Sequence, residues 1–142
     1  MVKIKAFQGL RPKAEYAAKL SSPPYDVLSS EEARVMAAGN EVSFLQVTKP
    51  EITFPTGSEP SGADLYERAR VNLLSLIDKG FLAKDTNRCI YIYRLTWREV
   101  DQTGYMVLSS VDDYLLGRIK RHEFTRPDKE ADRTKLNDVT NA

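Results

Sequence analysis

Apolar residues recur at helical spacing over one long segment in the middle of the chain, with polar residues between them. Lys79 and Gly80 close this segment and are typical of a helix end, while Ser61 and Asp64 precede it as a candidate N-terminal cap. We therefore predict a long helix whose apolar stripe packs in the core. The stripe consists of Leu65, Ala69, Leu73, Leu76 and Ile77.

Two shorter segments also have helical patterns. Ser29 and Glu32 form the Ser-x-x-Glu pattern of a capping box, in which each side chain satisfies a backbone N–H of the other residue. The helix that follows should stop at Gly39 and Asn40, because both residues tolerate a left-handed backbone. The alanine-rich residues 14–20 predict a further short helical segment.

Alternating or β-branched and aromatic residues mark the predicted strands. Residues 3–7 and 42–47 alternate polar and apolar positions. Residues 89–97 are apolar on both faces, which predicts a central strand that is covered on both sides. We expect residues 101–104 to turn and residues 105–111 to return as the hairpin partner. Together these elements predict an α+β fold, with helices packed on a mixed β-sheet of about four strands.

Composition describes an ordinary globular protein and narrows its chemistry. The 142 residues suit a single domain, 1–142, and the formal net charge of +1 gives no global field to recruit nucleic acid. One cysteine, Cys89, and one histidine, His122, exclude an intramolecular disulfide and a zinc site built from nitrogen and sulfur ligands. The sequence shows no signal peptide and no apolar run of membrane-spanning length. We expect a cytoplasmic protein that does not bind membranes.

Charged residues of both signs crowd residues 117–133, directly after the last predicted strand. This run contains the single histidine, His122, between Arg121 and Glu123. Its Arg and Lys side chains can bind an anion through charge-assisted hydrogen bonds of roughly 1.5–3 kcal/mol each. A neutral imidazole and a carboxylate can both carry protons at physiological pH. Pro127 suits the first position of a helix whose positive dipole end would point back toward the histidine.

A second candidate segment is stiff. Pro23 and Pro24 restrict the backbone to extended conformations just before Tyr25 and Asp26. Little conformational entropy is lost when a ligand binds to such a segment, so we expect it to form one wall of a site. The alternative is a connector whose Tyr25 packs on the core.

Both segments resemble the signature of a bacterial and archaeal family, catalogued as domain of unknown function number one thousand and fifteen. The resemblance rests on Gly-Arg-Ile-Lys-Arg-His-Glu-Phe-Thr-Arg-Pro-Asp-Lys-Glu-Ala-Asp-Arg at residues 117–133 and on Pro-Pro-Tyr-Asp-Val at residues 23–27. Family members are much longer and resemble the ParB and sulfiredoxin superfamily, and some are implied to be ATP-dependent kinases of free serine. The resemblance implies that this chain is the N-terminal part of such a protein, without its C-terminal part and inactive by itself.

The resemblance further implies a small-molecule phosphotransferase that uses ATP and Mg²⁺ and acts on serine or a similar hydroxy amino acid. This chemistry needs charge neutralisation at the phosphates and a base for the hydroxyl proton. In the matched segments Glu123 is the expected base and Asp26 its alternative, and both are candidates to bind Mg²⁺. Tyr25 is expected to contact the substrate. The expected phosphate-binding residues are His122, Arg126, and Arg121 or Lys120.

Two other interpretations stay open. One is a non-catalytic ParB-like module that binds a nucleotide or nucleic acid, although DNA-binding proteins usually present a clearly basic face and the net charge here is only +1. The other is that residues 117–133 form a salt-bridged surface element without a ligand. A nucleotide that perturbs the resonances of His122 would contradict this last interpretation.

Overall fold

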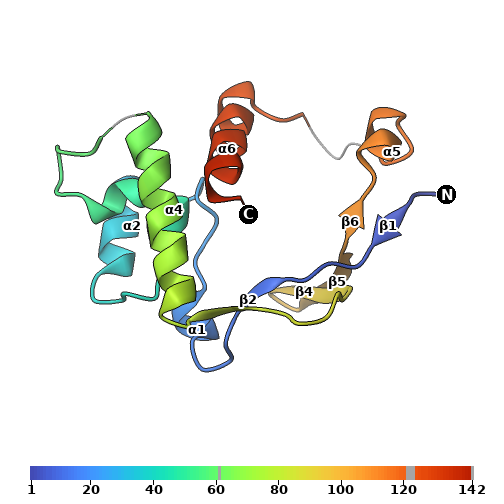
Figure 1. The fold of residues 1–142 in the computed structure, drawn as a ribbon, viewed down its shortest axis with the longest axis horizontal. Helices are drawn as coiled ribbons and strands as arrows, with labels where there is room; N and C mark the ends of the chain where they lie inside the picture. The colour runs from blue at the N-terminus through green and yellow to red at the C-terminus, as the bar shows by residue number, and fades with distance from the viewer. Residues whose placement is uncertain (61, 121–123, 142) are drawn as a thin grey trace. The chain divides into compact units, whose positions relative to one another are not determined.

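The described chain packs as two compact units. The computed structural model describes residues 1–60, 62–120 and 124–141. One unit, here called the strand unit, contains Met1–Arg11 and Lys84–Phe124, and the other, the helical unit, contains Pro12–Ala83 and Thr125–Ala142. The α+β class predicted from the sequence is confirmed (Figure 1). A single domain over residues 1–142 stays a prediction.

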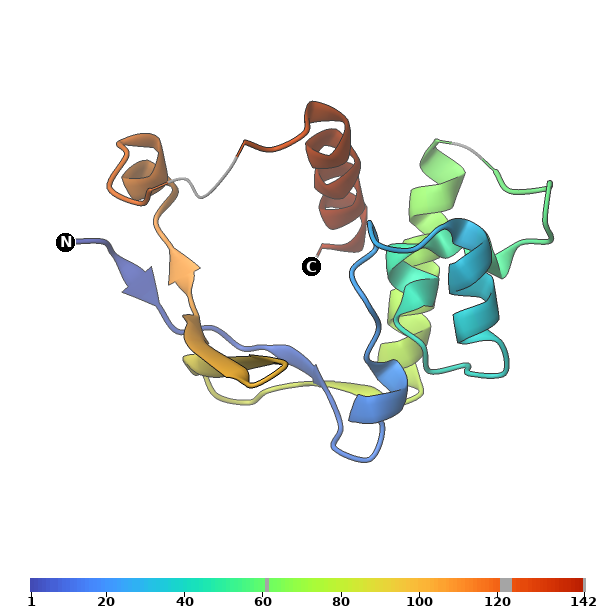
Figure 2. The ribbon, with the colours of Figure 1, turned by 180° about the vertical axis from the view of Figure 1, so that it is seen from behind.

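The helical unit is built around α4 (Ala63–Asp78), the long helix that the apolar stripe predicts. The helix α6 (Pro127–Thr140) lies beside it in both views (Figures 1 and 2). None of the described helices is long and apolar enough to cross a membrane. The other helical elements are α1 (Ala17–Leu20), α2 (Ser30–Ala37), α3 (Leu45–Thr48) and the 3₁₀ helix η1 (Pro50–Thr53).

The core of the helical unit forms where α4 meets the segments that precede and follow it. Leu73 and Leu76 of α4 belong to it, and the half-buried rings of Tyr16 and Phe81 pack against it. These two rings meet each other edge to face, with centroids 4.8 Å apart. Burial of such side chains stabilises the fold by about 1.5–3 kcal/mol for each fully buried residue. The remaining buried members are Leu20, Val42, Val47 and Leu82.

Local sequence signals place two helix starts. Ser29 and Glu32 form the predicted capping box: the Ser29 hydroxyl accepts from the Glu32 N–H at 3.2 Å, and the Glu32 carboxylate accepts from the Ser29 N–H at 2.8 Å. At α4 the N-terminal cap is Gly62, with φ of 70°, and Asp64 lies in the first turn. Ser61, the other residue of the predicted cap, lies outside the described residues.

The strand predicted over residues 42–47 is wrong, because this segment forms a turn followed by α3. The Asn40 side chain accepts from the Val42 N–H at 3.2 Å, and this bond bends the chain into the turn. The turn and the short helix bring Val42, Leu45 and Val47 together into the core. Alternation over so few residues does not distinguish a strand from this arrangement.

Arg34 of α2 fixes η1 and the loop after it. Its guanidinium donates to the carbonyl oxygens of Ile52 at 2.8 Å and Glu51 at 3.0 Å, and also to the carbonyl oxygen of Phe54. It forms an ion pair with Glu59 as well, at 2.5 Å. One side chain therefore gathers a stretch that contains little regular structure.

The strands do not form the single mixed sheet that the sequence suggested. They make small two-stranded antiparallel sheets, because each described strand pairs with one other strand. In the strand unit β4 pairs with β5 and β1 with β6, and a single bridge joins Phe7 to Cys89. The strands are β1 (Ile4–Lys5), β2 (Leu10–Pro12), which pairs with β3 (Leu82–Lys84), then β4 (Tyr91–Trp97), β5 (Val100–Met106) and β6 (Leu108–Ser109).

The β4–β5 hairpin turns earlier than predicted. Trp97 pairs with Val100, so the turn is Arg98 and Glu99 rather than residues 101–104. Arg98 has φ of 55°, a left-handed conformation that costs a non-glycine residue about 1–2 kcal/mol. The earlier turn lets seven residue pairs form along the ladder. The side chains of β4 and β5 are mostly exposed, so the prediction of a strand covered on both faces is also wrong.

Asp113 anchors the end of the strand unit. It lies in α5 (Val111–Leu115) and is only 1% exposed. Its carboxylate accepts from the Lys3 N–H at 2.8 Å and from the Arg118 guanidinium at 2.7 Å. The hydrogen bond from the Lys3 N–H, followed by that from Arg118, lowers the pKa of Asp113. This buried carboxylate ties the residue before β1 to Arg118, at the start of residues 117–133.

Candidate functional site

The predicted site residues fall into three groups. Tyr25, Asp26 and Arg126 belong to the helical unit, and Lys120 is an exposed residue of the strand unit. Arg121, His122 and Glu123 lie outside the described residues, so their assigned roles stay predictions. The geometry of the site can therefore be built only on the helical unit, where the diproline segment meets α6.

Tyr25 lies against the cationic face of α6. The ring centroid is 3.9 Å from the Arg133 guanidinium carbon and 5.7 Å from the Lys129 ammonium nitrogen. Cations at such distances are attracted to the negative face of an aromatic ring by about 0.5–2 kcal/mol. The stiff segment is closed by a turn in which the Val27 N–H donates to the Pro24 carbonyl at 3.3 Å. The diproline segment thus forms a wall beside α6, and Tyr25 packs on side chains of that helix.

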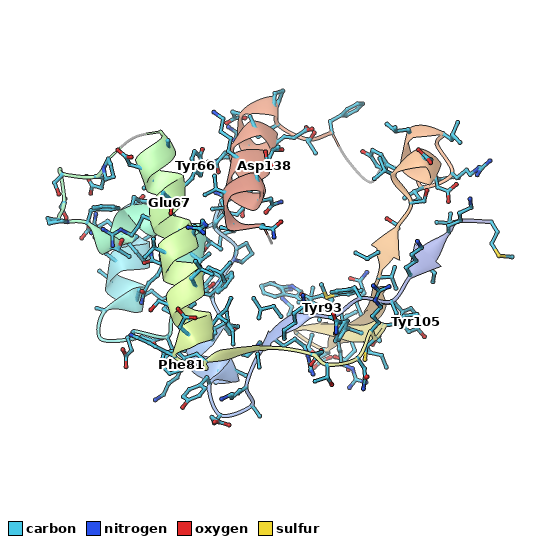
Figure 3. The ribbon with its side chains drawn as sticks, viewed as in Figure 1. Tyr66, Glu67, Phe81, Tyr93, Tyr105 and Asp138 are labelled. Carbon is cyan, nitrogen blue, oxygen red and sulfur yellow. The ribbon has the colours of Figure 1, made fainter. Side chains whose placement is uncertain are left out.

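A hydrogen-bonded chain holds α6 to α4. The Tyr66 hydroxyl donates to Asp132 at 2.8 Å, and Figure 3 shows Tyr66 extending from α4 toward α6. The Arg133 guanidinium donates to the same carboxylate through Nε at 2.9 Å, and to the Thr48 carbonyl at 3.5 Å. Burial of the Asp132 carboxyl acts to raise its pKa, but the hydrogen bonds from Arg133 and Tyr66 outweigh burial and lower the pKa. Arg133 is thereby fixed in the orientation in which it meets Tyr25.

The N-terminus of α6 matches the prediction from Pro127. Pro127 occupies the first turn and Arg126 the cap, and the Arg126 side chain makes no cap hydrogen bond. Arg126 pairs with Asp128 at 2.8 Å, and this hydrogen bond lowers the pKa of Asp128. Both side chains are largely exposed, so the pair contributes little to stability, and Arg126 can exchange Asp128 for another anion.

Asp26 follows Tyr25 and is exposed. Among the described residues it makes no hydrogen bond or ion pair, and Arg126 is bonded to Asp128 instead. No group of three or more His, Cys, Asp or Glu residues that could hold a metal ion occurs in the described part of the chain. Mg²⁺ that is bound to nucleotide phosphates commonly takes only one or two protein carboxylates, so Asp26 fits this role by its chemistry and accessibility.

Sequence analysis assigned no role to Lys129 or Arg133, although the structure brings both to Tyr25. The signal in the sequence was that Lys129 and Arg133 are four residues apart in the helix that Pro127 predicts, because residues four apart share one face of a helix. Arg126 is in turn three residues before Lys129. We call the set Tyr25, Asp26, Arg126, Lys129 and Arg133 the Tyr25–α6 surface.

The strand unit contains a separate polar depression of about 290 Å³, next to Arg11, Asp85 and Tyr91. Arg11 donates two hydrogen bonds of 2.8 Å to Asp85, and the Tyr91 hydroxyl donates to the same carboxylate at 2.6 Å. The Gly9 N–H donates to the Tyr91 oxygen at 2.6 Å, and a Cβ at Gly9 would lie 2.8 Å from that oxygen. These groups satisfy one another and hold the strand ends together, so we assign them a structural role.

Comparison with known proteins identifies a family but no characterised relative. The sequence profile of DUF1015, described as a protein of unknown function, matches residues 4–142. No curated protein and no solved structure matches the chain. The matched range contains both segments from which the resemblance was drawn and covers nearly the whole chain. The chain therefore belongs to the DUF1015 family.

Proposed function

We propose that this chain supplies nucleotide- and substrate-binding groups of a small-molecule phosphotransferase, which transfers a phosphoryl group from ATP to free serine or a similar hydroxy amino acid. The contact of Tyr25 with Lys129 and Arg133 carries the proposal, because it sets cations of α6 beside the diproline wall. The resemblance to ParB and sulfiredoxin-like proteins with serine kinase relatives supplies the reaction.

In this reaction the bond between the terminal phosphorus of ATP and the bridging oxygen breaks, and ADP leaves with the electron pair. A new bond forms between that phosphorus and the substrate hydroxyl oxygen, whose proton passes to Glu123 or Asp26. The protein's main contribution is to position the groups and to neutralise the phosphate charge. Asp26 and Glu123 would hold Mg²⁺, which would supply positive charge at the phosphates.

The cations of the Tyr25–α6 surface divide into a fixed and an available group. Arg133 is held by Asp132 and by the Thr48 carbonyl, so its role is to orient Tyr25. The side-chain ammonium of Lys129 makes no hydrogen bond or ion pair with another described residue, so its donors are available to a phosphate. Arg126 is exposed and can exchange Asp128 for a phosphate oxygen.

Titration with ATP, ADP and inorganic phosphate tests the proposal, with the resonances of the single histidine as the reporter. We expect ATP to shift these resonances, and Lys129→Ala to weaken ATP binding about tenfold. Lys135→Ala is the matched control, because Lys135 is an exposed lysine of the same helix away from the Tyr25–α6 surface. Equal affinities for the two variants would remove the Tyr25–α6 surface from nucleotide binding.

A phosphate-transfer assay with free serine, carried out on the full-length protein that contains this chain, then separates catalysis from binding alone. Glu123→Gln should abolish turnover while ATP still binds, and unchanged turnover would exclude Glu123 as the base. Binding of ATP without turnover in any protein that contains this chain would favour the alternative, a non-catalytic nucleotide-binding module.

A further inference from the structure

The cation contacts that the described residues make with the ring of Tyr25 all come from α6. The guanidinium carbon of Arg133 lies 3.9 Å from the ring centroid, and the ammonium nitrogen of Lys129 lies 5.7 Å from it. These two residues are one turn apart on the same helix, so both cations approach the ring from the α6 side. No described aromatic ring pairs with Tyr25. The side of the ring away from α6 therefore has no aromatic partner among the described residues.

The hydroxyl of Tyr25 is also available to a ligand. It makes no hydrogen bond with another described residue, although the side chain is half-buried. Every buried side-chain nitrogen or oxygen of the described part of the chain has a hydrogen-bond partner, so an oxygen without one must be accessible to solvent. A tyrosine hydroxyl usually finds a partner when its ring packs against protein. Tyr25 thus combines a partly accessible ring with an unused polar group.

The hydrogen-bond donors of α6 that remain available lie toward its N-terminus. Arg133 uses its guanidinium on Asp132, to which it donates through Nε at 2.9 Å and through Nη2. The ammonium of Lys129 makes no hydrogen bond with a described residue. Arg126 donates to Asp128 through Nε and Nη2, which leaves its Nη1 without a partner among the described residues. Phosphate oxygens need such donors.

Two carboxylates lie at the same end of α6, and both are exposed. Asp128 is bonded to Arg126, and Glu130 accepts from the Thr125 hydroxyl at 2.6 Å. The net charge of this end is therefore small, and binding of phosphate there depends on direct hydrogen bonds to Lys129 and Arg126. The positive end of the helix dipole adds to these bonds.

The order of these groups along α6 matches the order of the parts of a nucleotide. Lys129 precedes Arg133 by four residues and Arg126 precedes Lys129 by three, so the three residues span about 10 Å of the helix axis. A nucleoside triphosphate has a planar base at one end and its terminal phosphate at the other. The ring of Tyr25 lies at the Arg133 end, where a planar base can stack, and the available donors lie at the other end.

We propose that Tyr25 stacks on the base of ATP, and that the bound nucleotide runs along α6 with its terminal phosphate at the N-terminus of this helix. The base packs on the side of the ring away from α6, and the ribose passes the edge of the ring. This inference rests on the proposed function and assigns Tyr25 to the base rather than to the hydroxy amino acid. The reverse orientation would place the phosphates at Arg133, whose donors Asp132 already occupies.

Two ligands separate the contact with the base from the contacts with the phosphates. ATP has both parts, whereas inorganic tripolyphosphate has three phosphates and no base. We expect Tyr25→Leu to weaken ATP binding about tenfold in titration calorimetry, because a base–aromatic stack is lost, and to leave the affinity for tripolyphosphate unchanged. Tyr25→Phe keeps the ring and should bind ATP nearly as tightly as the original chain. The matched control is Tyr93→Leu, which replaces an exposed tyrosine of the strand unit and should change neither affinity.

Paramagnetic broadening tests the orientation of the nucleotide. Mn²⁺ added with ATP binds at the phosphates and broadens the resonances of nearby amides. We expect the Asp128 amide to broaden more than the Asn137 amide, which is nine residues later and about 13 Å further along α6. Broadening by Mn²⁺ alone is the reference, because Mn²⁺ also binds to exposed carboxylates. Stronger broadening at Asn137 than at Asp128 would overturn the orientation.

Three binding results would overturn the stacking of the base on Tyr25. The first is an equal loss of affinity for ATP and tripolyphosphate in Tyr25→Leu, since Tyr25 would then act on the phosphates. The second is a loss in Tyr25→Phe as large as that in Tyr25→Leu. The third is the absence of ATP binding, which overturns the proposed function as well. ATP binding that depends on the Tyr25 ring, without transfer to serine in the full-length protein, would instead remove the kinase activity and support the contact with the base.

Discussion

Removal of the Tyr66 hydroxyl should loosen α6 from α4. The Tyr66 hydroxyl donates to Asp132 at 2.8 Å, and the same carboxylate fixes Arg133 beneath the ring of Tyr25. Tyr66→Phe deletes this donor but keeps the ring and its packing. The variant therefore measures how strongly this hydrogen bond holds the helix that carries the Tyr25–α6 surface.

The expected loss follows from the chemistry and exposure of the pair. A hydrogen bond to a charged group contributes about 1.5–3 kcal/mol to stability. The Asp132 side chain is 35% exposed, so water can replace part of the lost bond. We therefore expect Tyr66→Phe to lower the free energy of unfolding by about 1–2 kcal/mol, which is a factor of about 5–30 in the folding equilibrium. Urea titration measures this as a lower midpoint with an unchanged slope.

The loss should also depend on pH. In the folded state burial acts to raise the pKa of Asp132, but the hydrogen bonds from Arg133 and Tyr66 outweigh burial and lower it. A carboxyl whose pKa is lowered by folding stabilises the folded state. This stabilisation is complete above the pKa of the unfolded state, about 3.9, and is lost as pH falls through the lower pKa of the folded state. The difference between Tyr66→Phe and the original chain should therefore be full at neutral pH and shrink in acid.

Tyr16→Phe is the matched control for this experiment. Tyr16 packs its half-buried ring against Phe81 in the same unit, but its hydroxyl makes no hydrogen bond to a described residue. Its loss should change the urea midpoint little. If Tyr66→Phe and Tyr16→Phe unfold at the same midpoint at neutral pH, the hydrogen bond to Asp132 does not hold α6 and the reasoning above is refuted.

Three further substitutions test other parts of the structure by the same urea titration. Ser29→Ala removes the capping box of α2 and should cost about 1 kcal/mol, so an unchanged midpoint would contradict the cap. Leu45→Ala opens a cavity at a fully buried position and should cost about 2–5 kcal/mol; a loss below that of Ser29→Ala would show that the site collapses freely. Asp113→Asn should destabilise at neutral pH, and this deficit should shrink only as pH falls below the unfolded carboxyl pKa of about 3.9 and through the folded pKa of Asp113, which the hydrogen bonds from the Lys3 N–H and Arg118 lower. A deficit that is constant with pH would contradict the ionised anchor.

Local signals predicted the helices α2, α4 and α6. The stripe from Leu65 to Ile77 has the period of α4, and Ser29 with Glu32 satisfies the first turn of α2 through nearby atoms alone. Pro127 marked the start of α6 for the same reason, because a fixed φ and a missing N–H suit only the first turn. Interactions over one or two turns are visible in a sequence.

The hairpin could not be placed from local signals. Gly104 suggested a turn, but the turn occurs at Arg98 in a left-handed conformation that arginine rarely adopts. Apolar residues on both sides of β4 suggested burial, yet the described chain leaves them exposed. Hydrophobicity in a sequence indicates a surface that favours contact and does not say which molecule supplies the contact.

The candidate site was only partly predictable, because residue types can be read from the sequence but contacts between distant segments cannot. The stiffness of the diproline segment and the charge of residues 117–133 follow from residue type. The contact of Tyr25 with Lys129 and Arg133 joins segments that are far apart in the sequence, and only the packing of α6 on α4 produces it. No periodicity within either segment contains that information.

The loop held by Arg34 is shaped largely by this one side chain, beside the Ser30 hydroxyl that donates to Glu51 and the Arg68 guanidinium that lies over the Phe54 ring. Three carbonyl groups and one carboxylate converge on a single planar guanidinium, and the ammonium group of lysine cannot reproduce that fork. Even a conservative exchange at this position would loosen the loop, although the contacts of Ser30 with Glu51 and of Arg68 with Phe54 would stay. The loop would then become a cleavage site for proteases, while the leucine-rich core beneath α4 stayed intact.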